Sequence, residues 1–139
     1  CRSSMPELVI SREFVKQMVT HCTACYPNEA CGILAGTGNR VTKVYPMSNS
    51  EPSPVSYFME PKEQFRVMKE LRQKGLTMAA IFHSHPQSPA FPSVKDVSLA
   101  FYQEAIYVII GLTNPESPEI RAYTIIEEQV REASLRIVD

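Results

Sequence analysis

The sequence predicts a single α/β domain with three layers, in which a mixed β-sheet is flanked by helices. Two continuous apolar runs, residues 77–82 and 105–112, are typical of strands that are covered on both faces. Three other segments begin at a helix-starting residue and continue with apolar residues at helical spacing. A chain of 139 residues is long enough for one such domain with one core.

The N-terminal part of the chain predicts a short strand followed by a helix. Residues 8–10 form the strand, and Ser11 can cap the helix, with Glu13 in its first turn. The sequence Tyr26-Pro27-Asn28 ends the helix, because a residue that precedes proline avoids the helical conformation. The apolar face of this helix consists of Phe14, Val15, Met18, Val19 and Cys22.

A hairpin and a loop are expected next. Residues 30–35 are a compact apolar run, residues 36–39 form a turn with two glycines, and residues 40–47 form the second strand. Two prolines make residues 48–55 a loop, and residues 56–59 suit a short strand.

The middle of the chain predicts a second helix and a buried strand. Pro61 suits the first helical position, and Gly75 can close the helix. The apolar run 77–82 then forms the strand. The residues expected on the buried side of this helix are Phe65, Met68 and Leu71.

The last third of the chain predicts one helix and three strands. The helix begins at Ser93, and its apolar residues are Val97, Leu99 and Phe101. The strands are expected at residues 105–112, 119–126 and 134–138, with a turn at 114–118 between the first two.

Charge and composition exclude several classes of partner. The chain has 14 basic and 15 acidic residues, which gives a formal net charge of −1. This balance gives no electrostatic footprint for nucleic acid, and no basic run indicates binding to a membrane surface. The longest apolar stretches are far too short to span a bilayer.

The N-terminus and the cysteines bear on where the protein acts. Residues 1–4 precede a methionine and resemble a remnant of an expression vector, so we expect the domain at residues 5–139. No apolar segment typical of a signal peptide is present.

The remaining cysteines, Cys22, Cys25 and Cys31, are a poor disulfide framework, and we expect structural roles for them in a reducing cytoplasm.

A pair of histidines follows the predicted strand at residues 77–82. In His83-Ser84-His85-Pro86, the two histidines are two residues apart, so an extended backbone points both imidazoles to one face. Two converging imidazole nitrogens suit zinc. The sequence therefore predicts a metal site at the end of this strand.

Asp96 can complete the ligand set. It lies in the first turn of the third predicted helix, and the proline-rich segment before that helix can return its carboxylate to the histidines. Two nitrogen ligands and one oxygen ligand leave a fourth position for water, which is typical of a catalytic zinc site. We expect one zinc ion per chain.

Hydrolysis by a zinc-bound water also needs a base for the water proton and a group that stabilises the transition state. Glu29, at the start of a predicted strand, is one candidate for the base, and the residues alone do not separate it from Glu51 or Glu60. The Ser93 hydroxyl can donate to the oxyanion of a tetrahedral intermediate. Ser93 and Asp96 also have the spacing of a helix capping box, and both roles can coexist.

The pattern His83-x-His85-x10-Asp96, with Ser93 three residues before the aspartate, resembles the motif of the JAMM (MPN+, Mov34, JAB1-type) zinc metallopeptidases. Residues 28–34 are similar to the glutamate-bearing strand of this family, and the order of elements from residue 8 to about residue 126 also fits. The compact chain resembles the prokaryotic branch. The resemblance implies a cytidine-deaminase-like fold, zinc bound by the two histidines and Asp96, Glu29 as general acid/base, and Ser93 as transition-state stabiliser.

The resemblance also implies a substrate. Relatives of this branch hydrolyse a peptide or isopeptide bond after the C-terminal Gly-Gly of a ubiquitin-like sulfur-carrier protein, for example to release cysteine or a C-terminal extension. An extended glycine tail can approach a narrow cleft and add to an exposed sheet edge. Residues 48–59 suit a flap over that tail. We expect the carrier as partner, and the chain itself as a monomer or homodimer.

Two other function classes remain open. A non-catalytic MPN-type interaction module is disfavoured because such modules lack the ligand set that this chain retains. A zinc hydrolase of small amides is the second alternative. The pattern of zinc deaminases, His-x-Glu followed by Pro-Cys-x-x-Cys, is absent, since no cysteine follows Cys31.

Overall fold

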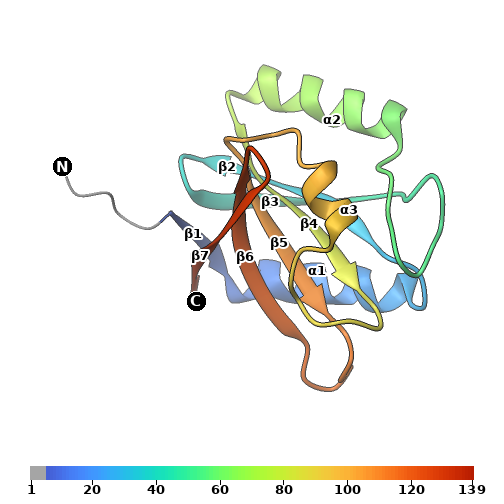
Figure 1. Cartoon of the computed structure of the whole chain (residues 1–139). Helices are drawn as coiled ribbons and strands as arrows, with labels where there is room; N and C mark the ends of the chain where they lie inside the picture. Colours follow the sequence, from blue (N-terminus) through green and yellow to red (C-terminus); the bar gives the residue numbers. More distant parts are fainter. Residues whose placement is uncertain (1–5) are drawn as a thin grey trace.

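The computed structural model describes residues 6–139, so the expected vector remnant at residues 1–4 lies outside the described residues. Three helices are interspersed among the strands in these residues, and the last three elements along the chain are strands (Figure 1). The elements are β1 (Glu7–Ser11), α1 (Arg12–Cys25), β2 (Cys31–Thr37), β3 (Arg40–Met47), α2 (Pro61–Lys74), β4 (Thr77–His85), α3 (Val94–Ser98), β5 (Ile106–Gly111), β6 (Glu119–Ile126) and β7 (Gln129–Val138). The helices among these residues are all too short or too polar to cross a lipid bilayer.

The strands form one mixed sheet in the order β1-β3-β2-β4-β5-β6-β7. The sheet closes into a barrel because β1 pairs in parallel with both β3 and β7. The pair β4–β5 is also parallel, and the other pairs are antiparallel. The mixed sheet is therefore confirmed, whereas its closure was not predicted.

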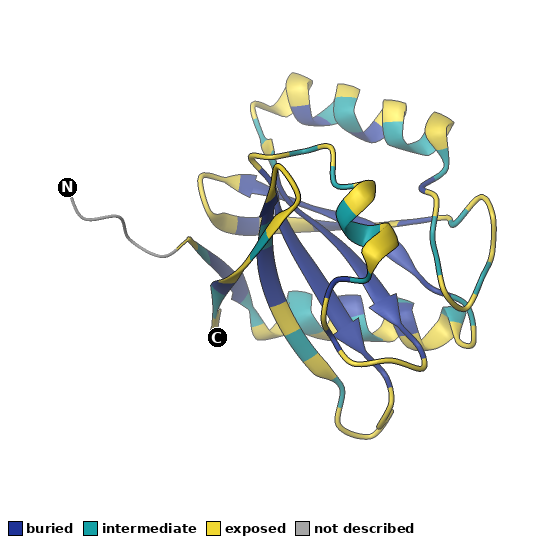
Figure 2. Cartoon of the chain, in the orientation of Figure 1, coloured by how far each residue is buried: buried dark blue, intermediate teal, exposed yellow. Residues whose placement is uncertain are grey.

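Two apolar clusters lie on opposite faces of the sheet. Met18 and Cys22 of α1 pack with Phe82 and other residues on one face, and Val67 and Leu71 of α2 pack on the other. Figure 1 shows α1 and α2 on opposite sides of the strands, and Figure 2 shows buried strands between helices with exposed outer faces. The predicted arrangement of a sheet flanked by helices is confirmed.

The helix ends follow their sequence signals. The Ser11 hydroxyl accepts a hydrogen bond from the Phe14 N–H at 3.2 Å and caps α1. Pro61 stands in the first turn of α2, and Gly75 closes this helix with a φ of 69° in the left-handed region. Glycine tolerates that conformation without a steric penalty.

The buried side of α2 differs from the prediction at one residue. Val67 and Leu71 are buried and Met68 packs against them, but Phe65 is 68% exposed. Phe65 is two residues, and so roughly 200° of helical rotation, away from Val67. The prediction that Phe65 belongs to the core is wrong.

Three other boundaries were also predicted incorrectly. Residues 56–59 form no strand, because only Met59 makes a β-bridge, with Asn49. The third helix has five residues, so Leu99 and Phe101 lie beyond it on the surface. β7 begins at Gln129, after a turn in which Glu127 and Glu128 take positive φ values. Such turns usually contain glycine or asparagine, so no residue type marks this turn in advance.

β4 is longer than predicted and includes both histidines of the motif. His83 and His85 pair with Ile109 and Gly111 of β5, and His83 also pairs with Cys31 of β2. Side chains alternate along a strand, so the two histidines share the face of Ile81, which packs under α2. The histidines therefore stand on a paired strand and not on a loop.

The burial pattern of α2 makes a stability prediction. We expect Leu71→Ala to lower the free energy of unfolding by about 2–5 kcal/mol, because it leaves a cavity in a packed cluster. Phe65→Ala should change this free energy by less than about 0.5 kcal/mol. Urea titrations of the two variants measure the difference, and equal destabilisation would contradict the assigned faces of α2.

Candidate metal centre

Three donor atoms converge where β4 ends beside α3. The Nε2 atoms of His83 and His85 are 3.2 Å apart, and they lie 3.1 Å and 2.9 Å from Oδ2 of Asp96. The two histidines are 1% and 3% exposed, and the Asp96 side chain is 9% exposed. Within the described residues this is the one group of three or more such side chains that meets the geometry of a metal site.

The spacing of these atoms fits a small tetrahedral cation. Zinc binds imidazole nitrogen and carboxylate oxygen at about 2.0–2.1 Å, so tetrahedral ligands around it stand about 3.3–3.4 Å apart. The observed separations of 2.9 to 3.2 Å need only a small outward shift to reach that value. Two imidazoles and one carboxylate also match the ligand chemistry of zinc and leave one position open.

A hydrogen bond fixes the tautomer of His85. Its Nδ1 lies 2.8 Å from the carbonyl oxygen of Pro89, which can only accept, so the proton is on Nδ1. When the His85 ring is neutral, the lone pair of its Nε2 then faces His83 and Asp96, as a metal ligand requires; when the ring is protonated, Nε2 donates to Asp96 instead. Burial alone would lower the pKa of His85, but the hydrogen bonds to Asp96 and Pro89 outweigh it and raise that pKa.

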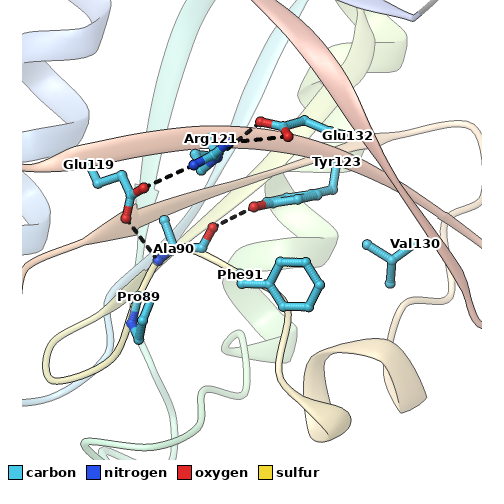
Figure 3. A pocket seen from close by; sticks show the side chains of 8 residues that line it. All are labelled: Pro89, Ala90, Phe91, Glu119, Arg121, Tyr123, Val130 and Glu132. Carbon is cyan, nitrogen blue, oxygen red and sulfur yellow. Dashed lines mark hydrogen bonds and ion pairs between the residues drawn. The ribbon is translucent and has the colours of Figure 1, made fainter.

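The segment that carries Pro89 is hydrogen-bonded to two residues of β6, as Figure 3 shows. The Tyr123 hydroxyl donates to the carbonyl oxygen of Ala90 at 2.6 Å, and Glu119 accepts from the Ala90 N–H at 3.3 Å. Arg121 beside them pairs with Glu119 and Glu132, so its charge is balanced. These contacts with β6 hold the segment whose Pro89 carbonyl binds His85, and so support the position of that ring.

Asp96 combines two roles at the start of α3. The Ser93 hydroxyl accepts from the Asp96 N–H at 3.0 Å, and the Ser93 N–H donates to Oδ2 of Asp96 at 2.9 Å. The predicted capping box is therefore present, and the same oxygen faces the histidines. Burial would raise the pKa of Asp96, but hydrogen bonds to His83, His85 and Ser93 hold it well below its usual range.

Glu29 lies beside this centre as a buried carboxyl group. It is 4% exposed, and its Oε1 has no hydrogen-bond partner among the described residues. Cys31 pairs with His83 across the β2–β4 ladder, and the Ser84 N–H donates to the Ala30 carbonyl oxygen. Continuing this register by two residues beyond β2 brings Glu29 opposite His85. Burial raises the pKa of Glu29 to about 8; His85 lowers that pKa and Asp96 raises it.

The two other candidate bases lie elsewhere. Glu60 caps α2, because its side chain accepts from the Glu63 N–H at 2.8 Å. Glu51 is exposed on the loop between β3 and α2. Of the three carboxylates that the residues alone left open, the structure places Glu29 opposite a histidine of the centre.

Ser84 and Tyr57 support the centre, although the sequence predicted no role for either. Ser84 points to the opposite face from the histidines, where its Oγ accepts from the Ala30 N–H at 2.8 Å. This hydrogen bond joins Ala30, the residue after Glu29, to β4. The alternation of side chains along a strand could have predicted that Ser84 points away from the face of the two histidines. The ring of Tyr57 stacks on His83 at 4.6 Å, a long-range contact with no sequence signal.

The fold and the donor set define the class of the protein as a JAMM-type peptidase domain, as expected. The comparison with family models agrees. Residues 11–126 match the model described as prokaryotic homologs of the JAB domain, so the chain belongs to this family. The expected family and its JAB1/MPN fold are therefore confirmed.

Individual relatives cover most of the chain. It is 36% identical over 134 residues to the CysO-cysteine peptidase of Mycobacterium tuberculosis, covering 95% of this chain and 92% of the relative. It is 33% identical over 123 residues to the probable TtuB-protein conjugate cleaving protease of Thermus thermophilus, a match that covers 88% of this chain and 78% of the relative. The solution structure of protein DSY2949 from Desulfitobacterium hafniense is similar with a TM-score of 0.86 and 35% identity, covering 95% and 93%.

The raised pKa of Glu29 makes a prediction for the metal-free protein. A carboxyl whose pKa is about 8 when folded and near 4.5 when unfolded costs stability as pH rises between those values. We therefore expect metal-free Glu29→Gln to match the wild type near pH 4. At pH 8 it should be more stable by roughly 1–3 kcal/mol.

Urea titrations at several pH values, with chelator present, measure this difference. Glu51→Gln is the matched control, because Glu51 is exposed. It should follow the wild type at every pH. A Glu29→Gln effect that is the same at pH 4 and pH 8 would contradict the buried, unpaired state of Glu29.

Proposed function

We propose that this chain is a zinc-dependent peptidase that hydrolyses a peptide or isopeptide bond after the C-terminal Gly-Gly of a ubiquitin-like or sulfur-carrier protein. The observation that carries the proposal is the convergence of His83, His85 and Asp96 beside the buried carboxyl of Glu29. The names of the relatives support the substrate class, since one is a CysO-cysteine peptidase and another is a probable TtuB-protein conjugate cleaving protease.

His83, His85 and Asp96 would hold one zinc ion per chain. When bound, zinc supplies Lewis acidity and lowers the pKa of a water ligand to about 7. The protein supplies the orientation of the ligands. The carbonyl of Pro89 fixes the His85 ring, and the capping box fixes the Asp96 carboxylate.

Glu29 is the proposed general base and acid. It would take a proton from the attacking water and pass it to the leaving amine. Burial raises its pKa to about 8, and a cation nearby would lower that pKa toward neutrality. A pKa near the working pH suits a group that must both accept and return a proton.

Ser93 is the proposed donor to the oxyanion. Its Oγ accepts from the Asp96 N–H, which leaves its own hydroxyl proton free to donate. One such donor typically lowers the barrier by about 2.7–4 kcal/mol. The backbone of Ser93 also binds Asp96, so the donor and the proposed ligand are held together.

An apolar groove beside the metal centre is the proposed path of the carrier tail. It is a cavity of about 140 Å³ between the loop before α2 and the segment after α3. Tyr57, which stacks on His83, and the exposed Phe101 are both among the residues that line it. Residues 48–59 are the proposed flap, and glycines at the end of the tail would allow close approach to the metal.

The cellular setting is part of the same proposal. Cys22, Cys25 and Cys31 are free, which supports a reducing cytoplasm. Burial raises the pKa of Cys22 and Cys31 to about 12, so these thiols remain protonated and poor metal ligands. We propose that the chain acts as a monomer or homodimer.

Zinc content and turnover test the proposed roles separately. Glu29→Gln should keep about one zinc per chain and lose at least about 100-fold in turnover of a carrier–peptide fusion, because proton transfer is removed. His83→Ala should lose both zinc and turnover. His21→Ala is the control; His21 contacts the Cys31 and Met47 carbonyl oxygens outside the centre, and this variant should retain zinc.

The same assays separate the alternative functions. A wild-type protein that binds the carrier without zinc or turnover would identify an interaction module. Hydrolysis of short glycine amides as efficient as that of the fusion would indicate a small-amide hydrolase. Full turnover by Glu29→Gln would contradict the assignment of the base.

A further inference from the structure

The side chain of Asn49 uses all of its hydrogen-bonding capacity inside the loop between β3 and α2. Its Nδ2 donates to the carbonyl oxygens of Glu29 and Ser56, both at 3.2 Å. Its Oδ1 accepts from the N–H groups of Phe58 at 2.9 Å and Glu51 at 3.1 Å. A carboxamide has two N–H donors and two acceptor lone pairs, so this group is saturated.

Two of these hydrogen bonds bind the backbone on either side of Tyr57. Ser56 and Phe58 are its neighbours in sequence, and Asn49 binds the backbone of both. The ring of Tyr57 stacks on His83 with centroids 4.6 Å apart and planes 27° apart. Asn49 therefore holds the backbone on either side of the ring that covers a proposed metal ligand.

A third bond reaches Glu29. Asn49 donates to its carbonyl oxygen, and the Glu29 N–H donates to the carbonyl oxygen of Ser53 in the same loop at 2.7 Å. The Oε1 atom of Glu29 has no partner among the described residues. The loop thus binds both backbone polar groups of Glu29 and holds the main chain from which its carboxyl group extends.

We propose that Asn49 is a positioning residue that holds Glu29 and Tyr57 in a fixed relation to the metal centre. This inference rests on the proposed function, in which Glu29 moves the proton. One carboxamide connects the proposed base to the ring that covers His83, although Asn49 itself touches neither Nε2 nor the Glu29 carboxyl. Its loss would let the base shift, and a misplacement of about 1 Å can cost about 100-fold in rate.

The ends of the loop do not depend on this side chain. Glu63 accepts from the N–H and the hydroxyl of Ser48, at 2.8 and 2.7 Å. The Glu60 N–H donates to the Ser48 carbonyl at 3.0 Å, and the Ser50 N–H donates to the Phe58 carbonyl at 2.8 Å. Asn49→Ala should therefore fold with its loop attached at both ends.

The first test is kinetic, with a carrier–peptide fusion as substrate. Asn49→Ala should retain one zinc per chain and lose about 10–100-fold in kcat, with a smaller change in KM. In the Glu29→Gln background the same substitution should change kcat by less than about twofold, because its effect passes through Glu29. Asn114→Ala is the matched control, since Asn114 makes a similar bond to the Glu116 N–H in a distant turn.

The second test needs no turnover. In metal-free protein, ring currents from Tyr57 should shift the NMR signals of the His83 ring. Asn49→Ala should move these signals toward the values of an uncovered histidine, while those of His21 stay unchanged. Should Asn49→Ala show no cooperative unfolding, Asn49→Asp replaces it in both tests; it keeps the acceptor oxygen and removes both donated bonds.

The outcomes separate this inference from the proposed function. A zinc-loaded wild type that cleaves no carrier fusion contradicts the proposed function itself. If the wild type is active, any one of three results would overturn the role of Asn49 and leave the proposed function intact. Asn49→Ala would keep the wild-type kcat, its effect would be fully additive with that of Glu29→Gln, or the His83 signals would not move.

Discussion

The convergence of His83, His85 and Asp96 depends on one strand and one helix cap. β4 stays paired with β5 through its last residue, so its alternation directs both imidazoles to one face. The capping box of α3 brings the Asp96 carboxylate to the same point and uses one of its oxygens for both tasks. Helix capping and the proposed metal binding therefore depend on the same carboxylate.

The two acidic residues of the site have opposite environments, and this difference accounts for their proposed roles. Asp96 accepts hydrogen bonds from three groups, which keep it ionised and suited to bind a cation. Glu29 is buried, and its Oε1 has no partner in the described part of the chain; burial raises its pKa toward the range where it exchanges protons. Environment rather than residue type thus distinguishes a proposed ligand from a proposed base.

The sequence was informative at several helix ends and along β4, whereas helical spacing alone wrongly placed Phe65 in the core. Ser11, Pro61 and Gly75 marked helix ends correctly, and the alternation through His83 and His85 placed both on one face. Contacts between distant segments had no such signal. The stacking of Tyr57 on His83 and the parallel pairing of β1 with β7 each depend on tertiary structure, and the turn at Glu127 lacks the glycine or asparagine that would mark it. Choosing Glu29 over two other glutamates needed either a family resemblance or the β2–β4 register.

X-ray absorption at the zinc edge of the zinc-loaded protein tests the central claim most directly. We expect one zinc per chain with about four nitrogen or oxygen ligands near 2.0–2.1 Å, two of them with the multiple-scattering signature of imidazole. A sulfur shell near 2.3 Å would assign the metal to the cysteines and contradict the account. Protein that binds no zinc when the metal is in excess would contradict it as well.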